Sequence, residues 1–476
     1  MAAPTGWGKT TLALARMVRL KPVKVFYILP TITAIKDFYE TFSKILDETY
    51  VGEYFYFADV ELLGRSGSDE EETLIDIYRY FIPKITITTI DQLLLTTLQI
   101  GRYHVRRFNL KNSLLILDEF HLLTPQMIAA LRLLLKKLSQ HYNISYLFMS
   151  ATPSPVYGEL LKDALQPQPL KTMILRDEYR CLARHKIEYC DDKRVEDLLM
   201  EKRDLLFGLR TLIIVNTVKK AQKIYRNLKE ELGNRRNIVL IHGDFAYKDR
   251  MRKEVEIDRA DILVSTQVAE ISLDVSFDLL LTELSPIPSL IQRFGRVNRY
   301  GSVSEKTNVF IAEPEHPQPY GEILISNSRE NLPMLLDTLK RKGEEAYLNE
   351  EFWEYERAYL TDVKSVEEKI SGKMDKMLSF FSFLAREEEI IEMLGREETF
   401  LAIPKIYLEE VLKLYKKLED TTYEGRKKLY AEIKGNFVPI SRSDIRSRKA
   451  EWCEELKLPV IMNYDMDVGL IRVNEK

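Results

Sequence analysis

The stretch Ala3-Pro4-Thr5-Gly6-Trp7-Gly8-Lys9-Thr10 decides how this 476-residue chain is expected to fold. It matches a phosphate-binding loop in which Ala replaces the usual first Gly. Gly6 and Gly8 allow a tight turn that aims backbone N–H groups at phosphate oxygens, and Lys9 is placed to reach the β- and γ-phosphates. The Thr10 hydroxyl is a ligand for Mg²⁺, and a helix predicted over residues 10–20 directs its positive N-terminus at the same anion. The loop therefore predicts a nucleoside triphosphatase.

The loop lies unusually close to the start of the sequence. Such a loop normally follows a buried strand of a parallel sheet, but only Met1 and Ala2 precede it here. We therefore expect the first strand of the domain to be missing from this sequence.

Composition indicates a globular protein with sizeable cores. Hydrophobic residues make up 45% of the sequence, charged residues 30%, and the net charge is −3. This charge does not suggest a nucleic-acid binder, although a basic groove can be local. The three cysteines lack metal-binding spacing, and we find neither a signal peptide nor an apolar run of transmembrane length. We therefore expect a cytoplasmic protein with no membrane partner.

Short apolar runs alternate with helical patterns in two successive stretches. The helices predicted there include residues 32–45 and 218–232. The predicted strands are residues 23–29, 84–89, 113–117, 145–149, 211–215, 238–241, 261–264, 277–282 and 308–311. This alternation predicts an α/β fold with two doubly wound parallel sheets. Charged helical patterns follow at 322–343, 363–396 and 407–434. We expect α/β domains at 1–180 and 181–315, and a mostly helical C-terminal accessory region at 316–476.

An acidic motif follows the strand predicted over residues 113–117. Ligands of open α/β sheets bind at the carboxyl ends of strands, so Asp118 and Glu119 are expected to face the phosphate-binding loop. Asp118 is then a ligand for Mg²⁺, directly or through water, and Glu119 orients and deprotonates the attacking water. The alternative is a solvated acidic strand end, and the paired carboxylates together with the loop argue against it.

Three arginines surround a glycine in the segment Gln292-Arg293-Phe294-Gly295-Arg296-Val297-Asn298-Arg299. Arg296 and Arg299 suit arginine fingers, because a planar guanidinium holds phosphate oxygens in two places with a fixed charge. Gln292 is placed to orient the water or to contact the γ-phosphate. The alternative is a basic helix end on the surface, and for Arg293 the sequence leaves both interpretations open.

Taken in order, the motifs over residues 3–299 resemble those of a superfamily two helicase built from two RecA-like domains. A narrower resemblance is to the CRISPR-associated helicase of type I interference systems, on the segments Pro30-Thr31, Thr88-Thr89-Ile90-Asp91-Gln92, Val215-Asn216-Thr217-Val218, Thr266-Gln267-Val268 with Glu270 and Asp274, and Thr282-Glu283-Leu284 through Gly295-Arg296. Residues 316–476 carry no comparable match.

The resemblance implies an ATP-dependent helicase or translocase acting on single-stranded DNA in antiviral defence, recruited to an RNA-guided CRISPR surveillance complex. It implies that Ser150 and Thr152, with His121, couple the nucleotide state to the nucleic-acid path. It places Asp274 beside the nucleotide ribose or the motif arginines. Contacts to the strand, through phosphates and without reading sequence, would come from Pro30, Thr31, Thr88, Thr89, Thr217, His242 and Thr266. For His242, a structural role at a strand end is an equally open alternative.

The sequence also departs from that family. Many members are fused to a metal-dependent nuclease domain that contains an adjacent His-Asp pair, but none of the six histidines here is followed by Asp. We therefore expect the nuclease to be a separate subunit. The family's adenine-reading Gln loop also precedes the phosphate-binding loop, so a preference for ATP cannot be read from these residues.

Two other functions stay open at this point. A DNA-repair, restriction or RNA helicase of the same superfamily would carry similar motifs, and stimulation of ATP hydrolysis by single-stranded DNA or by RNA would distinguish these cases. A non-catalytic scaffold subunit is favoured by the missing first strand. The intact catalytic motifs, including Lys9, Glu119 and Arg296, argue against it.

Overall fold

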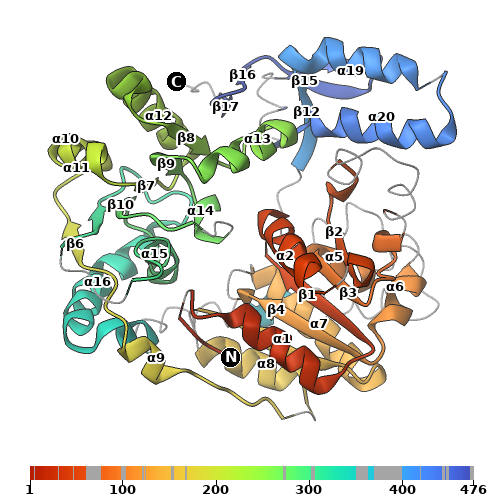
Figure 1. The fold of residues 1–476 in the computed structure, drawn as a ribbon, viewed down its shortest axis with the longest axis horizontal. Coiled ribbons are helices and arrows are strands. Elements are labelled where there is room, and N and C mark those ends of the chain that lie inside the picture. The colour runs from red at the N-terminus through yellow and green to blue at the C-terminus, as the bar shows by residue number, and fades with distance from the viewer. Residues whose placement is uncertain are drawn as a thin grey trace. The chain divides into compact units, whose positions relative to one another are not determined.

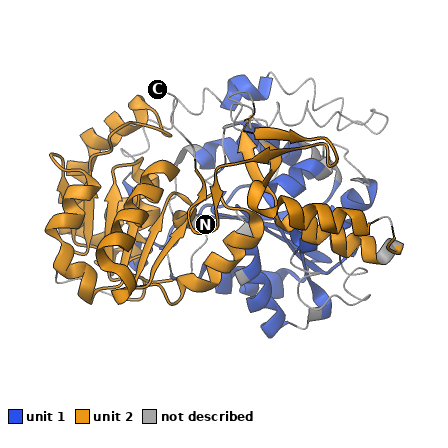
Figure 2. Cartoon of the chain, turned by 90° about the horizontal axis from the view of Figure 1, so that it is seen from above, with its two compact units in different colours: residues 1–178, 348–398 blue, residues 179–347, 399–476 orange. Residues whose placement is uncertain are grey.

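The computed structural model describes residues 1–4, 6–30, 32–46, 48–60, 75, 77–97, 103–120, 123, 125–151, 155–166, 169–271, 275–301, 306–349, 363–368, 399–418, 420–441, 445 and 450–471 (Figure 1). The chain forms two compact units (Figure 2): unit 1 is residues 1–178 with 348–398, and unit 2 is residues 179–347 with 399–476. The region expected at 316–476 is thus shared between the units. Within the described residues, no helix has the length and apolar character needed to span a bilayer.

Unit 1 is built on a five-stranded, fully parallel sheet in the order β2-β3-β1-β4-β5. Its strands are β1 (Lys24–Leu29), β2 (Val51–Tyr54), β3 (Ile85–Thr89), β4 (Ser113–Asp118) and β5 (Ser145–Met149). The chain passes from β1 to β2 and β3 on one side, and then to β4 on the other. The carboxyl ends of β1 and β4 therefore flank a topological switch point, the usual ligand site of such sheets.

Helices pack around this sheet, and their bounds are α1 (Lys9–Leu20), α2 (Ile32–Ile45), α5 (Ile90–Thr97), α6 (Tyr103–Leu110), α7 (Pro125–His141), α8 (Pro155–Ala164) and α9 (Arg176–Arg180). Every residue of β4 is buried, as expected for a parallel strand covered on both faces. The core of the unit joins sheet residues such as Phe26 and Leu115 to the apolar face of α7 at Leu134 and Leu138.

The residues before the phosphate-binding loop run beside the end of β5. Ala2 forms parallel bridges to Ser150 and Ile174. The Ala3 N–H donates to the Ser150 carbonyl at 3.3 Å. This pairing delivers the loop to the carboxyl edge of the sheet.

Unit 2 repeats the same arrangement with one more strand. Its parallel sheet has the order β6-β11-β10-β7-β9-β8. Read from its other edge, the sheet runs β8-β9-β7-β10-β11, which repeats the order β2-β3-β1-β4-β5 of unit 1, and β6 is the additional strand beyond β11. The strands are β6 (Ile187–Cys190), β7 (Thr211–Ile214), β8 (Ile238–Ile241), β9 (Ile262–Ser265), β10 (Leu279–Glu283) and β11 (Val309–Ala312). The switch point of unit 2 therefore lies between β7 and β10, and the predicted pair of doubly wound sheets is confirmed.

The helices of unit 2 before its C-terminal part are α10 (Val195–Glu201), α11 (Arg203–Gly208), α12 (Val218–Leu232), α13 (Tyr247–Ile257), α14 (Val268–Ile271), α15 (Ile287–Phe294) and α16 (Glu322–Lys342). α12 packs on β8 and β9, and α10 packs on β10 and β11. The α12 bounds coincide with the helix predicted over residues 218–232.

The C-terminal part of unit 2 contains helices and also strands that the sequence pattern did not predict. The helices are α19 (Lys405–Lys417) and α20 (Tyr423–Gly435). A four-stranded sheet in the order β13-β12-β15-β14 accompanies them, formed by β12 (Thr399–Pro404), β13 (Val438–Ser441), β14 (Ala450–Cys453) and β15 (Leu458–Ile461). A hairpin of β16 (Tyr464–Asp465) and β17 (Gly469–Leu470) follows. Most of these strands have only two to four residues, too few to show a period of two. Of the helix predicted over 363–396, residues 363–368 are described and helical, and the rest lies outside the described residues.

We predict that Phe26→Ala lowers the free energy of unfolding of unit 1 by about 3–5 kcal/mol, because it opens a cavity in the core. Phe26 is fully buried in β1, and its ring meets that of Phe81 edge-on at 5.4 Å between centroids. The matched control is Phe108→Ala on α6, where the side chain is 76% exposed and the expected loss is below about 0.5 kcal/mol. Hydrogen exchange of the β1 amides measures the opening of this unit, and equal losses in the two variants would contradict the packing described.

Candidate active site

The phosphate-binding loop has the backbone conformation that its glycines were expected to supply. Gly6 and Gly8 have φ angles of 78° and 97°, in the left-handed region that disfavours other residues. Gly8 is also the N-cap of α1, so no side chain caps the helix, and its first turn contains no acidic residue. The first N–H groups of α1 thus lack acceptors within the helix and are oriented to bind an anion. Thr5 lies outside the described residues.

The acidic motif contacts the loop directly. The Glu119 carboxylate forms an ion pair with the Lys9 ammonium. Its second oxygen accepts the Ala151 N–H, which follows β5, at 3.2 Å. Glu119 has a φ of 45°, an unusual conformation for a residue other than glycine, which typically costs about 1–3 kcal/mol. Such a conformation persists where surrounding contacts fix it, and these two contacts connect the acidic motif, the loop and the end of β5.

Asp118 is buried at the end of β4, with both oxygens held. Oδ1 accepts the Glu119 N–H at 3.0 Å, and Oδ2 accepts the Tyr27 hydroxyl at 3.1 Å. Burial and the neighbouring Glu119 raise the pKa of Asp118 to about 6, and the Lys9 charge opposes that rise.

Tyr27 is a site residue that the sequence pattern did not reveal. It lies in β1, fully buried, and its pKa is raised well above the ordinary value by burial and by Asp118, so the phenol is a neutral donor. In the sequence, Tyr27 lies within the mostly apolar segment Lys24–Leu29 and is not distinguished from its neighbours. The pairing of β1 with β4 would have indicated its role, because Tyr27 pairs with Ile116, and Asp118 lies two residues after Ile116 on the same face of the sheet.

The oxygens of Asp118 and Thr10 are chemically suited to Mg²⁺. Hard carboxylate and hydroxyl oxygens are its usual protein ligands, with waters and phosphates completing the shell. The raised pKa of Asp118 also reflects negative charge crowded at a buried position, which a divalent cation would offset.

The other residues of unit 1 singled out in the sequence lie at the same carboxyl edge. Pro30 is half-buried after β1, while Thr88, Thr89 and Ser150 are buried. The Thr88 hydroxyl donates to the Tyr54 carbonyl at 2.6 Å within the sheet. The remaining candidates, His121, Thr31, Thr152 and also Asp274 of unit 2, lie outside the described residues.

The segment of unit 2 that carries the arginines is more buried than expected. Arg293, in α15, is fully buried, so its interpretation as a surface helix end is wrong. Its guanidinium donates to the Glu270 carboxylate at 2.8 Å, to the Thr282 hydroxyl at 2.8 Å and to the Asn216 side chain at 3.1 Å. These contacts make Arg293 a structural connection between α14, β10 and the loop after β7.

The other residues of this segment lie in and just after the end of α15. Gln292 and Arg296 are buried, and Arg299 is half-buried. The Arg296 guanidinium donates to the Glu270 carbonyl at 2.5 Å, and the Arg299 N–H donates to the Ser276 hydroxyl at 3.1 Å.

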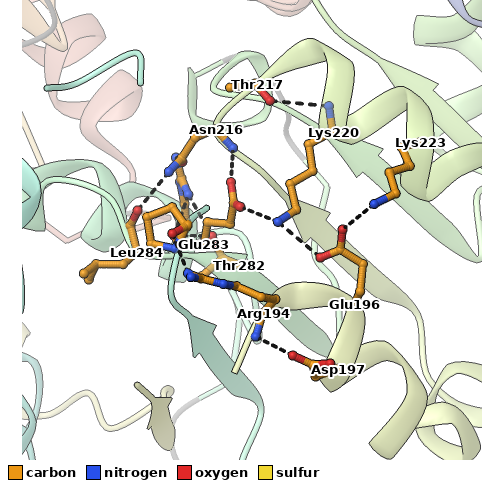
Figure 3. A network of polar contacts seen from close by, with 12 residues as sticks. Arg194, Glu196, Asp197, Asn216, Thr217, Lys220, Lys223, Thr282, Glu283 and Leu284 are labelled. Carbon is orange, nitrogen blue, oxygen red and sulfur yellow. Dashed lines mark hydrogen bonds and ion pairs between the residues drawn. The ribbon is translucent and has the colours of Figure 1, made fainter. Parts of the chain in front are cut away.

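The loop after β7 is held by Asn216 (Figure 3). Its N–H donates to the Glu283 carboxylate at 2.7 Å, and its side-chain amide donates to the Leu284 carbonyl at 2.9 Å. The other oxygen of Glu283 pairs with Lys220 at 2.9 Å, and Lys220 also pairs with Glu196 at 3.1 Å. The network fixes this loop against the end of β10.

Thr217 begins α12 at this fixed loop. It is half-buried, and its hydroxyl oxygen accepts the Lys220 N–H at 3.4 Å as the N-cap (Figure 3). Thr266, after β9, is buried. Thr217 thus presents a hydroxyl and a helix N-terminus at the switch point of unit 2.

His242 is fully buried after β8. Its Nδ1 accepts the Asp244 N–H at 3.1 Å, its Nε2 lies 3.0 Å from the Val468 carbonyl, and its ring stacks on Phe245 with centroids 4.4 Å apart. Because both ring nitrogens have partners inside unit 2, these contacts favour the structural alternative over a contact with nucleic acid.

Comparison with known proteins matches both halves of the chain to helicases. The family model "DEAD/DEAH box helicase" matches residues 1–160, and "CRISPR-associated nuclease/helicase Cas3, C-terminal" matches residues 208–302. A CRISPR-associated nuclease/helicase Cas3 from Methanocaldococcus jannaschii is 28% identical over 400 residues, which cover 76% of this chain and 53% of that protein. The Escherichia coli Cas3 endonuclease/helicase is 27% identical over 357 residues, covering 63% and 40%. The chain therefore spans about half or less of these relatives.

The fold is shared with a solved Cas3. The structure titled "Crystal structure of T. fusca Cas3-ADP" superposes with a TM-score of 0.73 at 17% identity, covering 99% of this chain and 68% of that one. At this identity the likeness shows the fold, two tandem RecA-like α/β units with an accessory region. Two helicase family models matched in sequence order, the Cas3 relatives and the shared fold show that this chain resembles the Cas3 helicases of CRISPR systems, which fits helicase superfamily two.

Proposed function

We propose that this chain is an ATP-dependent motor that unwinds or moves along single-stranded DNA in a CRISPR type I defence system. The observation that carries the proposal is the contact of Lys9 with Glu119 beside the buried Asp118. This arrangement brings together a phosphate-binding lysine, a general base and a metal ligand at the carboxyl edge of one sheet. The T. fusca neighbour is named with ADP, which supports nucleotide binding by a chain of this fold.

In the proposed mechanism the triphosphate binds the N–H groups of the loop and the start of α1. Lys9 then exchanges its Glu119 partner for the β- and γ-phosphate oxygens. The released Glu119 carboxylate, still held by the Ala151 N–H, orients the attacking water and accepts its proton. Thr10 and Asp118 would hold Mg²⁺, which supplies neutralisation of the phosphate charge.

The arginine segment completes the proposed chemistry. Arg296 and Arg299 are the proposed fingers, and in related phosphoryl-transfer enzymes such residues contribute roughly 10³–10⁵ in rate. Gln292 would contact the γ-phosphate or the water, and Asp274 the ribose. Arg296 would have to leave the Glu270 carbonyl to reach a phosphate.

The proposed DNA contacts are to phosphates. In unit 2, Thr217 is the best supported residue, because its oxygen accepts the Lys220 N–H and its hydroxyl proton is left to donate. Four further residues remain proposed phosphate contacts through side chain or backbone: Thr266 in unit 2, and Pro30, Thr31 and Thr89 in unit 1. We also propose that Ser150, Thr152 and His121 couple the nucleotide state to the nucleic-acid path. Thr88 would act through its backbone, since its hydroxyl is engaged in the sheet.

The proposed partners are an RNA-guided surveillance complex and a nuclease. A solved assembly titled "CRISPR RNA-guided surveillance complex, pre-nicking" contains a chain with this fold, at a TM-score of 0.63. None of the six histidines of residues 1–476 is followed by Asp. In our proposal a separate nuclease subunit supplies the cutting activity, and residues 1–476 supply the motor.

We predict that Lys9→Ala reduces ATP hydrolysis in the presence of single-stranded DNA by at least about 100-fold, the scale on which removal of one charge-stabilising donor acts. Phosphate release with and without single-stranded DNA, or RNA of the same sequence, measures the effect and the preferred nucleic acid. Lys21→Ala is the control, since Lys21 is exposed after the other end of α1. Wild-type turnover in Lys9→Ala would exclude the mechanism.

We predict that Glu119→Gln binds ATP with near wild-type affinity but hydrolyses it about 10²–10⁴-fold more slowly, because the amide cannot accept the water's proton. Binding of a fluorescent ATP analogue and phosphate release separate the two steps. If nucleotide affinity falls together with turnover, Glu119 is not acting as the base.

A further inference from the structure

The Tyr27 hydroxyl is a polar group placed inside an otherwise apolar layer. Its ring packs against Phe38 and Phe42 of α2, with centroids at 4.6 Å and 5.7 Å. Phe would fill the same space without the hydroxyl. Burying a hydroxyl without a hydrogen-bond partner costs about 1–3 kcal/mol of stability. The partner of the Tyr27 hydroxyl therefore indicates the role of this group.

That partner belongs to the acidic motif. The Tyr27 hydroxyl donates to Oδ2 of Asp118 at 3.1 Å, while Oδ1 accepts the Glu119 N–H at 3.0 Å. The Tyr27 phenol therefore fixes one oxygen of Asp118, a side chain suited to Mg²⁺.

The strand register explains why Tyr27 reaches this position. Tyr27 pairs with Ile116 of β4, and Asp118 lies two residues further along the same face. β1 and β4 flank the switch point of the unit. A long side chain on β1 at this level is directed to the carboxylate that ends β4.

We propose that Tyr27 is a positioning residue that fixes the Asp118 carboxylate in the arrangement that binds Mg²⁺ with the nucleotide. This inference rests on the proposed function. Groups that orient metal ligands typically contribute 10–100-fold in metal affinity. Tyr27 contacts neither phosphate nor water in this role and acts through Asp118.

The test is the Mg²⁺ dependence of nucleotide binding in Tyr27→Phe, measured with a fluorescent non-hydrolysable ATP analogue across a Mg²⁺ titration and in EDTA. We expect the Mg²⁺ concentration for half-maximal binding to rise about 10–100-fold. Binding at saturating Mg²⁺ and in EDTA should match the wild type, and so should the melting temperature within a few degrees. Tyr146→Phe is the matched control, because Tyr146 lies in β5 of the same sheet and its hydroxyl meets Ser139 at 3.4 Å.

A double-mutant cycle with Asp118→Asn makes the test independent of simple destabilisation. Since Tyr27 acts through Asp118, Tyr27→Phe should change the Mg²⁺ dependence little further once Asp118→Asn is already present. An unchanged Mg²⁺ dependence in Tyr27→Phe alone, or an equal further loss when it is added to Asp118→Asn, would overturn the role of Tyr27 while leaving the proposed function intact. A wild-type protein without Mg²⁺-dependent nucleotide binding would overturn both.

Discussion

Two adjacent carboxylates at the buried end of β4 are the constraint around which unit 1 is organised. A buried carboxylate is tolerated only with hydrogen bonds or a counter-charge. Different elements each supply one donor to the pair: Lys9 from α1, Tyr27 from β1 and the Ala151 N–H after β5. The raised pKa of Asp118 shows that this compensation is incomplete. In the proposed function, a metal-bound nucleotide at this edge of the sheet would offset the remaining negative charge.

Unit 2 has the same strand order but the opposite charge at its centre. Here a buried cation, Arg293, is compensated by Glu270 and by oxygen acceptors on β10 and the loop after β7. A second cation, Lys220, balances Glu283. Removing one partner of such a buried ion pair typically lowers the free energy of unfolding by about 3–5 kcal/mol. This network therefore favours one geometry of the loops after β7 and β9. The same fold therefore surrounds a pair of carboxylates with donors in unit 1 and a buried arginine with acceptors in unit 2.

The sequence predicted elements well where burial imposes a period. α2 at Ile32–Ile45, β5 at Ser145–Met149 and α12 at Val218–Leu232 have the predicted bounds, because long apolar stripes and continuous apolar runs identify helices and parallel strands. The accessory sheet was missed, since its short strands take their stability from partners distant in the chain. Single side chains were harder to predict than elements. Motif spacing identified Asp118 and Glu119 but gave no sign of Tyr27, whose role depends on the register between β1 and β4. It also left the role of Arg293 open, because all arginines of the segment lie close together in the sequence and only the fold shows the contacts of Arg293 with Glu270, Thr282 and Asn216.

The hairpin at the end of the described chain explains the burial of His242. The Leu470 N–H donates to the Asp244 carbonyl at 2.9 Å, and Gln222 of α12 donates to the Val468 carbonyl at 2.6 Å. Gly469 has a φ of 74°, and a Cβ there would lie 2.7 Å from both the Asp244 carbonyl oxygen and the His242 ring. Only a residue without a side chain permits this approach, so the hairpin is an integral layer of unit 2. Because it covers the end of β8, the DNA contacts proposed for unit 2 fall on groups after β7 and β9, where hydroxyls and N–H groups suit phosphates without selecting a base.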